Sequence, residues 1–342
     1  MTKEQGALRY PWAEPPAFGV PQTVADGIEW LRIPLPMALD HVNCWILSED
    51  DGVTIVDTGL NTSKTRDMWR AALGARRVKR VLVTHHHPDH VGLAGWFQAE
   101  FGAELLMPRT GWLMARMLTL DVQERPVPET VAYWKAAGMA EDILAQRMSE
   151  RPFNFADGVA PMPLGYTRLA DQDMIQLAGR WWHIHMGDGH APEHATLWEE
   201  GGPLVLGGDQ LLPSISPNLG IYATEPEADP VGDWLASCER FQGFATEDKL
   251  VLPGHKLPFT GLPVRMRQMM DNHRHALDRL VVHLDRPRTA VECYIPVFGR
   301  EIGGSQYGFA LVEAMAHCMH LVHTGRAERR ISEDGAWRFV AA

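Results

Sequence analysis

THHHPDHVG (residues 84–92) is the stretch of this chain that decides its fold. The apolar run KRVLVT (79–84) leads into it and predicts a short buried strand. The run HVGLAGWFQAEFG (90–102) follows with helical spacing and ends at a glycine, which predicts an amphipathic helix. The histidine-rich segment therefore lies where a buried strand ends and a helix begins.

Four side chains of this segment can point toward one place. His85 and His87 are two residues apart on extended backbone, so their side chains project to the same side. Asp89 and His90 fall at the turn into the helix and can face back toward them. Imidazole and carboxylate are ligands that zinc, iron and manganese take in hydrolytic sites. The spacing H-x-H-x-D-H therefore predicts a metal site.

Four residues elsewhere in the chain also lie at or after the end of a predicted strand. Asp57 ends a predicted strand in VDTGL, and Asp209 ends one in LGGDQ. His255 ends a third in LPGHKLP, and His190 lies in GDGHAPEH after a predicted strand. Ligands converge where strands end at one edge of a sheet, so we expect these side chains to meet the first cluster.

In this order, the motifs resemble the metal-binding pattern of the metallo-β-lactamase fold superfamily over roughly residues 25–262. The resemblance implies an α/β fold in which two sheets lie between helical layers, an αββα sandwich. It also implies a dinuclear centre. One metal ion would be held by His85, His87 and His190; the other by Asp89, His90 and His255; Asp209 would bridge them, and Asp57 would orient a ligand through a hydrogen bond.

The chemistry expected from such a centre is hydrolysis by a metal-bridging hydroxide. Two divalent ions, most simply zinc with iron or manganese as alternatives, lower the pKa of the water between them. Asp89 is the carboxylate best placed to take the proton of the attacking water. Asp57 would hold a metal ligand in place through a hydrogen bond. We therefore take Asp89 and Asp57 as the catalytic candidates.

The pattern along the chain predicts three parts. These are a flexible proline-rich arm at 1–22, a catalytic domain at 23–262 with a helical insertion at about 110–160, and a winged-helix-like domain at 263–342. Further strands are predicted at 28–33, 42–47, 52–57, 174–179, 180–186, 195–200, 203–209 and 249–255, and further helices at 62–73, 229–241, 264–284, 289–298 and 307–325.

Composition restricts the partners and the compartment. The net charge is −11, while residues 265–342 carry 11 Lys and Arg against 9 Asp and Glu, so a nucleic-acid partner is disfavoured. Four widely spaced cysteines and the lack of a visible signal peptide or apolar membrane span favour the cytoplasm. We expect a small-molecule acyl substrate, no membrane partner, and a homodimer as one arrangement of the chain.

Several residues are weaker candidates. His41 and Asn43 could lie on the substrate side of the metals, and the loop with Ser214, Ser216, Asn218 and Tyr222 could shape a leaving-group pocket. We expect structural roles for His183, His185 and His194, and we expect His86 to point away from the metals. In the C-terminal part no carboxylate or cysteine pattern completes a metal site, so we expect packing or a subunit contact for His273, His275, His283, His317, His320 and His323.

Three functions remain open on the sequence. A catalytic domain followed by a winged helix resembles the lactamase-like subgroup that includes an endoribonuclease and polyketide thioesterases. The Met- and Trp-rich insertion favours an apolar wall of the substrate pocket. The leading hypothesis is therefore cleavage of a carboxylic ester, thioester or lactone. A metal-dependent phosphodiesterase or endoribonuclease is the alternative. A non-catalytic scaffold braced by metals is the third and is disfavoured because all seven ligand positions are filled.

Overall fold

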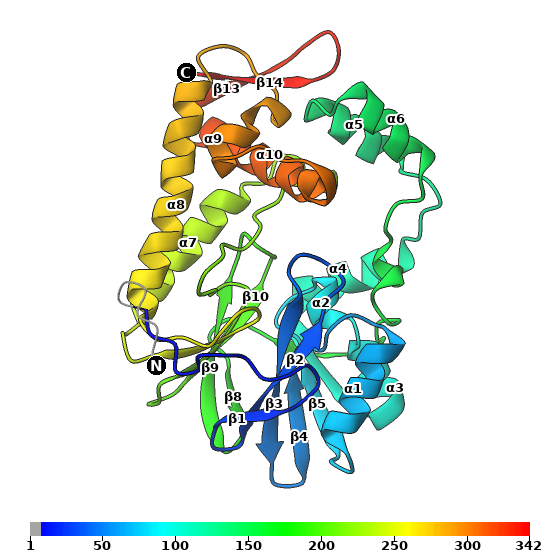
Figure 1. Ribbon diagram of the computed structural model, residues 1–342, viewed down its shortest axis with the longest axis vertical. Helices are drawn as coiled ribbons and strands as arrows, with labels where there is room; N and C mark the ends of the chain where they lie inside the picture. Colours follow the sequence, from blue (N-terminus) through cyan, green and yellow to red (C-terminus); the bar gives the residue numbers. More distant parts are fainter. Residues whose placement is uncertain (1–7) are drawn as a thin grey trace.

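The computed structural model describes residues 8–342, apart from the side chain of Ser305 (Figure 1). A seven-stranded sheet forms the first half of the fold, and its strands lie side by side in chain order. Neighbours are antiparallel from β1 to β4 and parallel from β4 to β7. The strands are β1 (Gln22–Ala25), β2 (Ile28–Pro34), β3 (His41–Glu49), β4 (Gly52–Val56), β5 (Val78–Leu82), β6 (Glu104–Pro108) and β7 (Thr167–Leu169).

A five-stranded sheet forms the second half, in the spatial order β12-β11-β10-β9-β8. Only its β11–β12 pair is parallel. The strands are β8 (Met174–Leu177), β9 (Arg180–Gly187), β10 (His194–Glu199), β11 (Leu204–Gly208) and β12 (Leu250–Pro253).

An apolar core joins the two sheets, and helices cover their outer faces (Figure 1). Trp30 and Trp45 of the first sheet stack with ring centroids 6.0 Å apart and share this core with Trp182 of the second. The outer core of the first sheet includes side chains of α1 (Ser63–Leu73) and α3 (Ala94–Phe101). That of the second includes α7 (Pro230–Gln242) and α8 (Leu262–His283). The layers follow the predicted αββα order.

The helix predicted at 90–102 is divided in two. The structure has a short α2 (Pro88–Val91), a break, and then α3. At the break the backbone N–H of Leu93 donates to Thr58 Oγ1 (2.9 Å) instead of to a helical carbonyl. The sequence pattern predicts no strand between 84 and about 166, whereas the structure has β6 there. Both differences lie beside the histidine motif.

The insertion packs against the C-terminal part of the chain. Its helices are α4 (Arg109–Leu120), α5 (Pro128–Ala136) and α6 (Glu141–Ser149), followed by the 3₁₀ turn η1 (Phe155–Asp157). Tyr133 donates from its hydroxyl to the carbonyl of Ile221 (2.6 Å), and Val291 N–H donates to the carbonyl of Ala137 (3.2 Å). Residues of α5 and α6 thus share one apolar core with the C-terminal helices.

The C-terminal part contains three α-helices followed by a hairpin, in the predicted order. The helix expected at 289–298 is the exception, because only its second half is α-helical and a 3₁₀ turn precedes it. The elements after α8 are η2 (Val291–Cys293), α9 (Tyr294–Phe298), η3 (Gly304–Gln306), α10 (Tyr307–His323), β13 (Ala327–Ile331) and β14 (Trp337–Ala341).

The proline-rich arm is attached rather than free where it is described. Residues 1–7 of the predicted arm lie outside the described residues. From there on, Leu8 is 4% exposed, and Arg9 and Thr260 exchange backbone hydrogen bonds. Arg32 also lies over the Phe18 ring at 4.4 Å, so the expectation of a flexible arm is wrong for residues 8–22. Within the described residues, the helices are too short or too polar to cross a membrane.

Candidate metal centre

The seven predicted ligands come together at one edge of the sandwich. Each follows a strand or lies in the short helix α2, so the two sheets deliver them from opposite sides. His85 and His87 follow β5, Asp89 and His90 belong to α2, His190 follows β9, Asp209 follows β11, and His255 follows β12.

Three imidazoles form the first group. Nε2 of His85 lies 3.0 Å from Nδ1 of His87, and the same Nδ1 lies 3.0 Å from Nε2 of His190. The three ligand nitrogens lie within 4.8 Å of one another. This is the set that the resemblance assigned to the first metal ion.

Asp209 contacts the first group and also the second. Its Oδ2 lies 3.4 Å from Nε2 of His190 and 3.1 Å from Nε2 of His255. Its Oδ1 lies 3.4 Å from Nε2 of His90. Asp89 completes the second group, with Oδ2 3.5 Å from Nε2 of His255 and 3.7 Å from Nε2 of His90. One carboxylate therefore reaches both groups of imidazoles.

The donor set fits divalent cations. Nε2 of His90 and Oδ1 of Asp209 are buried, and neither has a hydrogen-bond partner among the described residues. Leaving such lone pairs unsatisfied in the interior is unfavourable, by about 1–3 kcal/mol for each group. His85, His90 and Asp209 form a further group that could hold an ion. A cation at the point where these atoms converge would satisfy them.

Asp57 orients the His90 ring through the ring nitrogen that does not face the centre. Its carboxylate accepts from the backbone N–H of Thr84 (2.9 Å), from the Thr84 hydroxyl (2.9 Å) and from Nδ1 of His90 (2.8 Å). Asp57 has φ +57°, a left-handed backbone conformation that is uncommon for residues other than glycine. Because Nδ1 of His90 is committed to Asp57, Nε2 is left for a metal ion.

Other ligands are oriented by backbone carbonyls. His190 donates from Nδ1 to the carbonyl of Asn218 (2.9 Å), and His255 donates from Nδ1 to the carbonyl of His41 (2.7 Å). His85 donates from Nδ1 to the Thr84 hydroxyl (3.0 Å). All three rings therefore present Nε2 to the centre. No sequence pattern indicates Asn218 or His41 for this role, since the backbone carbonyl acts here and not the side chain.

The substrate-side role expected for His41 and Asn43 is wrong. The His41 ring is buried, and its Nε2 accepts from the backbone N–H of Lys256 (2.8 Å). The fully buried Asn43 donates to the carbonyls of Pro253 (2.9 Å) and Lys256 (2.8 Å). Both side chains hold the loop that carries His255. Both residues lie in β3, and the sequence does not indicate that this strand begins against the loop that carries His255.

Burial and neighbouring charges shift the pKa values of the ionisable groups of the centre in different directions. Burial lowers the pKa of His85 and His87 well below the ordinary value, which keeps both imidazoles neutral. Burial also opposes the charged form of His90, but the carboxylates of Asp209 and Asp89 outweigh it and raise the pKa of His90. The pKa of Asp209 is well below its usual range; burial opposes this, and the neighbouring histidines outweigh burial. His85 and His87 as neutral imidazoles and Asp209 as an ionised carboxylate are therefore in the forms that bind metals.

His194 has a structural role, because it holds the backbone of Asp209. Its Nε2 accepts from the backbone N–H of Asp209 (3.1 Å), and its ring stacks on His85 with centroids 4.5 Å apart. Gly208 has φ +48°, and a Cβ there would lie 2.4 Å from the His194 ring. His86 points away from the ligands and stacks with Phe155.

The other weaker candidate residues differ in whether they contact the centre. Asn218 contacts the centre through its carbonyl, whereas Ser214 is exposed and Tyr222 is 49% exposed on the same segment. His183 pairs with Glu200. Of the other weaker histidines, the structure gives these partners: His185 stacks on Phe244, His283 donates to the Glu292 carbonyl, His320 pairs with Asp229, and His323 donates to the Glu227 carbonyl.

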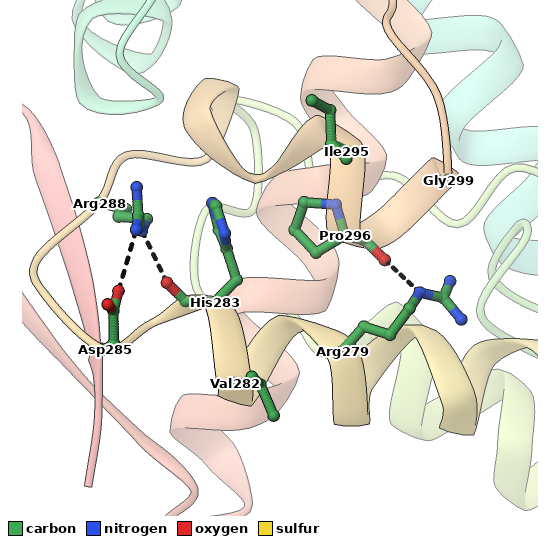
Figure 2. Close-up of a pocket in the computed structure, with 8 residues that line it drawn as sticks. All are labelled: Arg279, Val282, His283, Asp285, Arg288, Ile295, Pro296 and Gly299. Carbon is green, nitrogen blue, oxygen red and sulfur yellow. Dashed lines mark hydrogen bonds and ion pairs between the residues drawn. The ribbon is translucent and has the colours of Figure 1, made fainter.

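A surface pocket of about 450 Å³ lies elsewhere, between α8 and α9 (Figure 2). Its guanidinium groups are committed to the backbone: Arg279 donates to the Pro296 carbonyl (2.9 Å), and Arg288 donates to the His283 carbonyl (2.7 Å). None of the seven predicted ligands lines this pocket.

Comparisons with known proteins show to which family this chain is similar. Residues 37–255 match the Metallo-beta-lactamase superfamily, and residues 277–342 match a Metallo-beta-lactamase-like, C-terminal domain. A solved Beta-lactamase domain protein from Burkholderia ambifaria is 34% identical, covers 98% of both chains and has a TM-score of 0.89. Probable metallo-hydrolase YqjP of Bacillus subtilis is 25% identical over 77% of this chain and 82% of its own. Hydroxyacylglutathione hydrolase of Pseudomonas aeruginosa is 36% identical over 24% of this chain and 31% of its own. The chain therefore belongs to the metallo-β-lactamase superfamily and is a metallo-hydrolase.

Proposed function

We propose that the protein is a dinuclear hydrolase that cleaves a carboxylic ester, a thioester or a lactone. The observation that carries the dinuclear part is the position of Asp209, whose Oδ2 is 3.4 Å from His190 Nε2 and 3.1 Å from His255 Nε2. A carboxylate within reach of both imidazole groups is the arrangement that a bridging ligand needs. We favour zinc, with iron or manganese as alternatives, because imidazole and carboxylate suit all three.

When bound, two divalent ions would lower the pKa of a water between them and polarise the scissile carbonyl. The protein's own contribution is orientation and proton transfer. Asp57, Asn218 and His41 fix the rings of three histidines through the contacts given above. The Asp89 side chain is 18% exposed, against 0% for His90, so of these two it is the one that solvent and substrate reach. We assign to Asp89 the transfer of a proton from the attacking water.

Two observations favour an acyl substrate over a phosphodiester. First, one relative is named for an acyl derivative of glutathione, although it matches only 83 residues. Second, the one tight group of cations in the C-terminal part is neutralised by carboxylates, so it offers no free track for a polyphosphate. Arg326 pairs with Asp278, Arg329 with Glu227, and Arg330 with Glu328.

The exposed side chains of helix α4 favour a substrate that has an apolar part. It begins beside the metal motif, where Thr110 N–H donates to Glu193, near His190 in sequence. Leu113, Met117 and Leu120 follow at helical spacing and are all about half exposed or more. We propose that this stripe contacts the apolar part of the acyl substrate.

In this proposal the C-terminal helices and hairpin form a winged-helix-like domain with a packing role. Side chains of α5, α6, α8 and α10 share one core, which connects the insertion to the C-terminal part. The four cysteines are free and buried, which suits the cytoplasm as the proposed compartment. A homodimer stays a prediction.

The test is a substrate panel on protein of measured metal content. The panel contains a thioester, a lactone, a carboxylic ester and bis-nitrophenyl phosphate. We expect turnover of at least one acyl probe, its loss in Asp89→Asn, and its retention in His183→Asn, whose partner is Glu200, away from the centre. Turnover of the phosphodiester alone would favour the alternative, a phosphodiesterase or endoribonuclease. Bound metal with no turnover of any probe would favour a scaffold.

A further inference from the structure

Three side chains outside the metal centre are brought together between two helices of the C-terminal part. His273 lies on α8, and Glu313 and His317 lie on α10. The two residues of α10 are four apart, so they share one face of the helix. One ligand atom from each of the three side chains lies within 4.8 Å of the others.

The orientation of His317 repeats that of a ligand in the metal centre. Its Nδ1 donates to the backbone carbonyl of Glu313 (2.8 Å), which leaves the lone pair on Nε2, and Nε2 lies 3.2 Å from Nδ1 of His273. In the metal centre, Nδ1 of His190 likewise donates to a backbone carbonyl, and its Nε2 lies 3.0 Å from Nδ1 of His87. The same contact to a carbonyl fixes the ring in metal sites generally.

Two of the three side chains are almost fully buried. His273 is 2% exposed and His317 is 1% exposed, and the Trp234 ring lies 5.2 Å from the His273 ring. Nε2 of His273 is buried without a hydrogen-bond partner among the described residues. Burial lowers the pKa of His273 to about 3 and raises that of Glu313 to about 7. Burial therefore keeps the His273 imidazole neutral, and a cation would compensate the charge of the half-buried Glu313 carboxylate.

We propose that His273, Glu313 and His317 form a further metal site, separate from the hydrolytic centre, that binds a divalent transition-metal ion of the zinc class and joins α8 to α10. Two imidazoles and one carboxylate are a donor set that zinc takes, with a water completing the coordination. The spacing Glu-x-x-x-His on one helix with a histidine from its neighbour explains why the sequence alone did not indicate the site. The third ligand lies 40 residues or more away along the chain.

Glu313 also connects the two sites, which decides how the proposal is tested. Its carboxylate accepts from Nδ2 of Asn218 (2.6 Å), and the carbonyl of Asn218 orients His190. A change at Glu313 would therefore disturb the hydrolytic centre as well. His273 has no such contact and is the better position for substitution.

The experiment counts zinc ions per chain after zinc loading and removal of excess metal. We expect His273→Asn to bind about one equivalent less than the wild type. His275→Asn is the matched control, because His275 is exposed two residues away on the same helix, and it should bind as much zinc as the wild type. Equal zinc content in wild type and folded His273→Asn would overturn the proposal. His317→Gln gives the same comparison from α10.

A second measurement needs no substitution. Crystals of the zinc-loaded wild-type protein should give an anomalous-scattering peak at the zinc edge between α8 and α10, and absence of that peak would overturn the proposal even if the variants do not fold. Neither readout depends on turnover. The position of the anomalous peak is also independent of the hydrolytic centre, and the zinc count is compared between proteins whose hydrolytic ligands are unchanged. Failure of this proposal is therefore distinct from failure of the proposed hydrolysis.

Discussion

Oδ2 of Asp57 lies 2.8 Å from Nδ1 of His90, and this contact decides which nitrogen of His90 faces the metal centre. The same carboxylate holds the end of β5 through both the backbone N–H and the hydroxyl of Thr84. Thr84 in turn accepts from Nδ1 of His85. Asp57 therefore positions two candidate ligands, one directly and one through Thr84. This makes it a positioning residue and not one that contacts the substrate.

Asp57→Asn should weaken the centre without removing it. The amide keeps the size of the side chain but loses its charge and one acceptor, so we expect metal affinity or kcat to fall by ~10–100-fold. Competition titration with a zinc chelator and steady-state kinetics measure the two quantities. Asp50→Asn, at an exposed position in the β3–β4 turn, is the control and should behave as wild type. Wild-type metal affinity and kinetics in Asp57→Asn would contradict the role.

Substitution of His87 and of Asp209 should differ in metal content. His87 contacts only the first group of imidazoles, so His87→Ala should lose about one metal ion per chain. Asp209 contacts His190, His255 and His90, so Asp209→Ala should lower the content of both ions. Both variants should lose activity. Elemental analysis of the purified proteins checks this, and unchanged stoichiometry in either would refute that ligand assignment.

Gly92 of the histidine motif is required by a close backbone approach. A Cβ at this position would lie 2.3 Å from the carbonyl oxygen of Gly59 and 2.5 Å from that of Pro88. Backbone atoms cannot yield as a flexible side chain does, so Gly92→Ala should destabilise the fold by ~1–3 kcal/mol or more and reduce bound zinc. Urea unfolding measures the first effect. Gly165→Ala is the matched control, because a Cβ there meets nothing within 4 Å. Equal stability of the two variants would show that the approach is not tight.

Most of the hydrolytic centre could be predicted because its ligands carry their own signals. His85, His87 and Asp89 are close in sequence, and Asp209 and His255 each follow a β-run, so strand order alone brings them to one edge. The supporting contacts were not predictable in the same way. Any residue has a backbone carbonyl, so nothing in the sequence indicated that His41 would orient His255 or that Asn218 would orient His190.

Some features of the fold are not predictable from the sequence for the same reason. Strand β6 was missed because ELLMP (104–108) is a short apolar run between two helical patterns, and such runs have no period of their own. The break between α2 and α3 depends on Thr58, more than 30 residues before it, taking the N–H of Leu93. The pair of His273 and His317 also depends on packing between helices distant in sequence. Contacts of this kind follow from tertiary structure and leave no local pattern.

Asp229 gives a prediction for pH at a residue that is not itself a candidate metal ligand. It begins α7 by accepting from the backbone N–H of Gly232 (2.9 Å), and it also accepts from Nδ1 of His320 on α10 (2.9 Å). Burial opposes its charged form, but these hydrogen bonds outweigh burial and lower the pKa of Asp229. The ionised carboxylate thus stabilises the folded state by connecting two helices of the large apolar core.

Asp229→Asn isolates the charge, since asparagine also serves as an N-cap. A group whose pKa is lower in the folded state contributes stability that is fully present above its unfolded pKa, roughly 3.9, and is lost as pH falls through the folded pKa. At neutral pH we therefore expect the variant to be less stable than wild type by ~1 kcal/mol, the scale of a charged hydrogen bond at a helix start. The difference should shrink when urea unfolding of both metal-free proteins is repeated below about pH 4. A difference that stays constant or grows in acid would show that the carboxylate charge does not stabilise this contact.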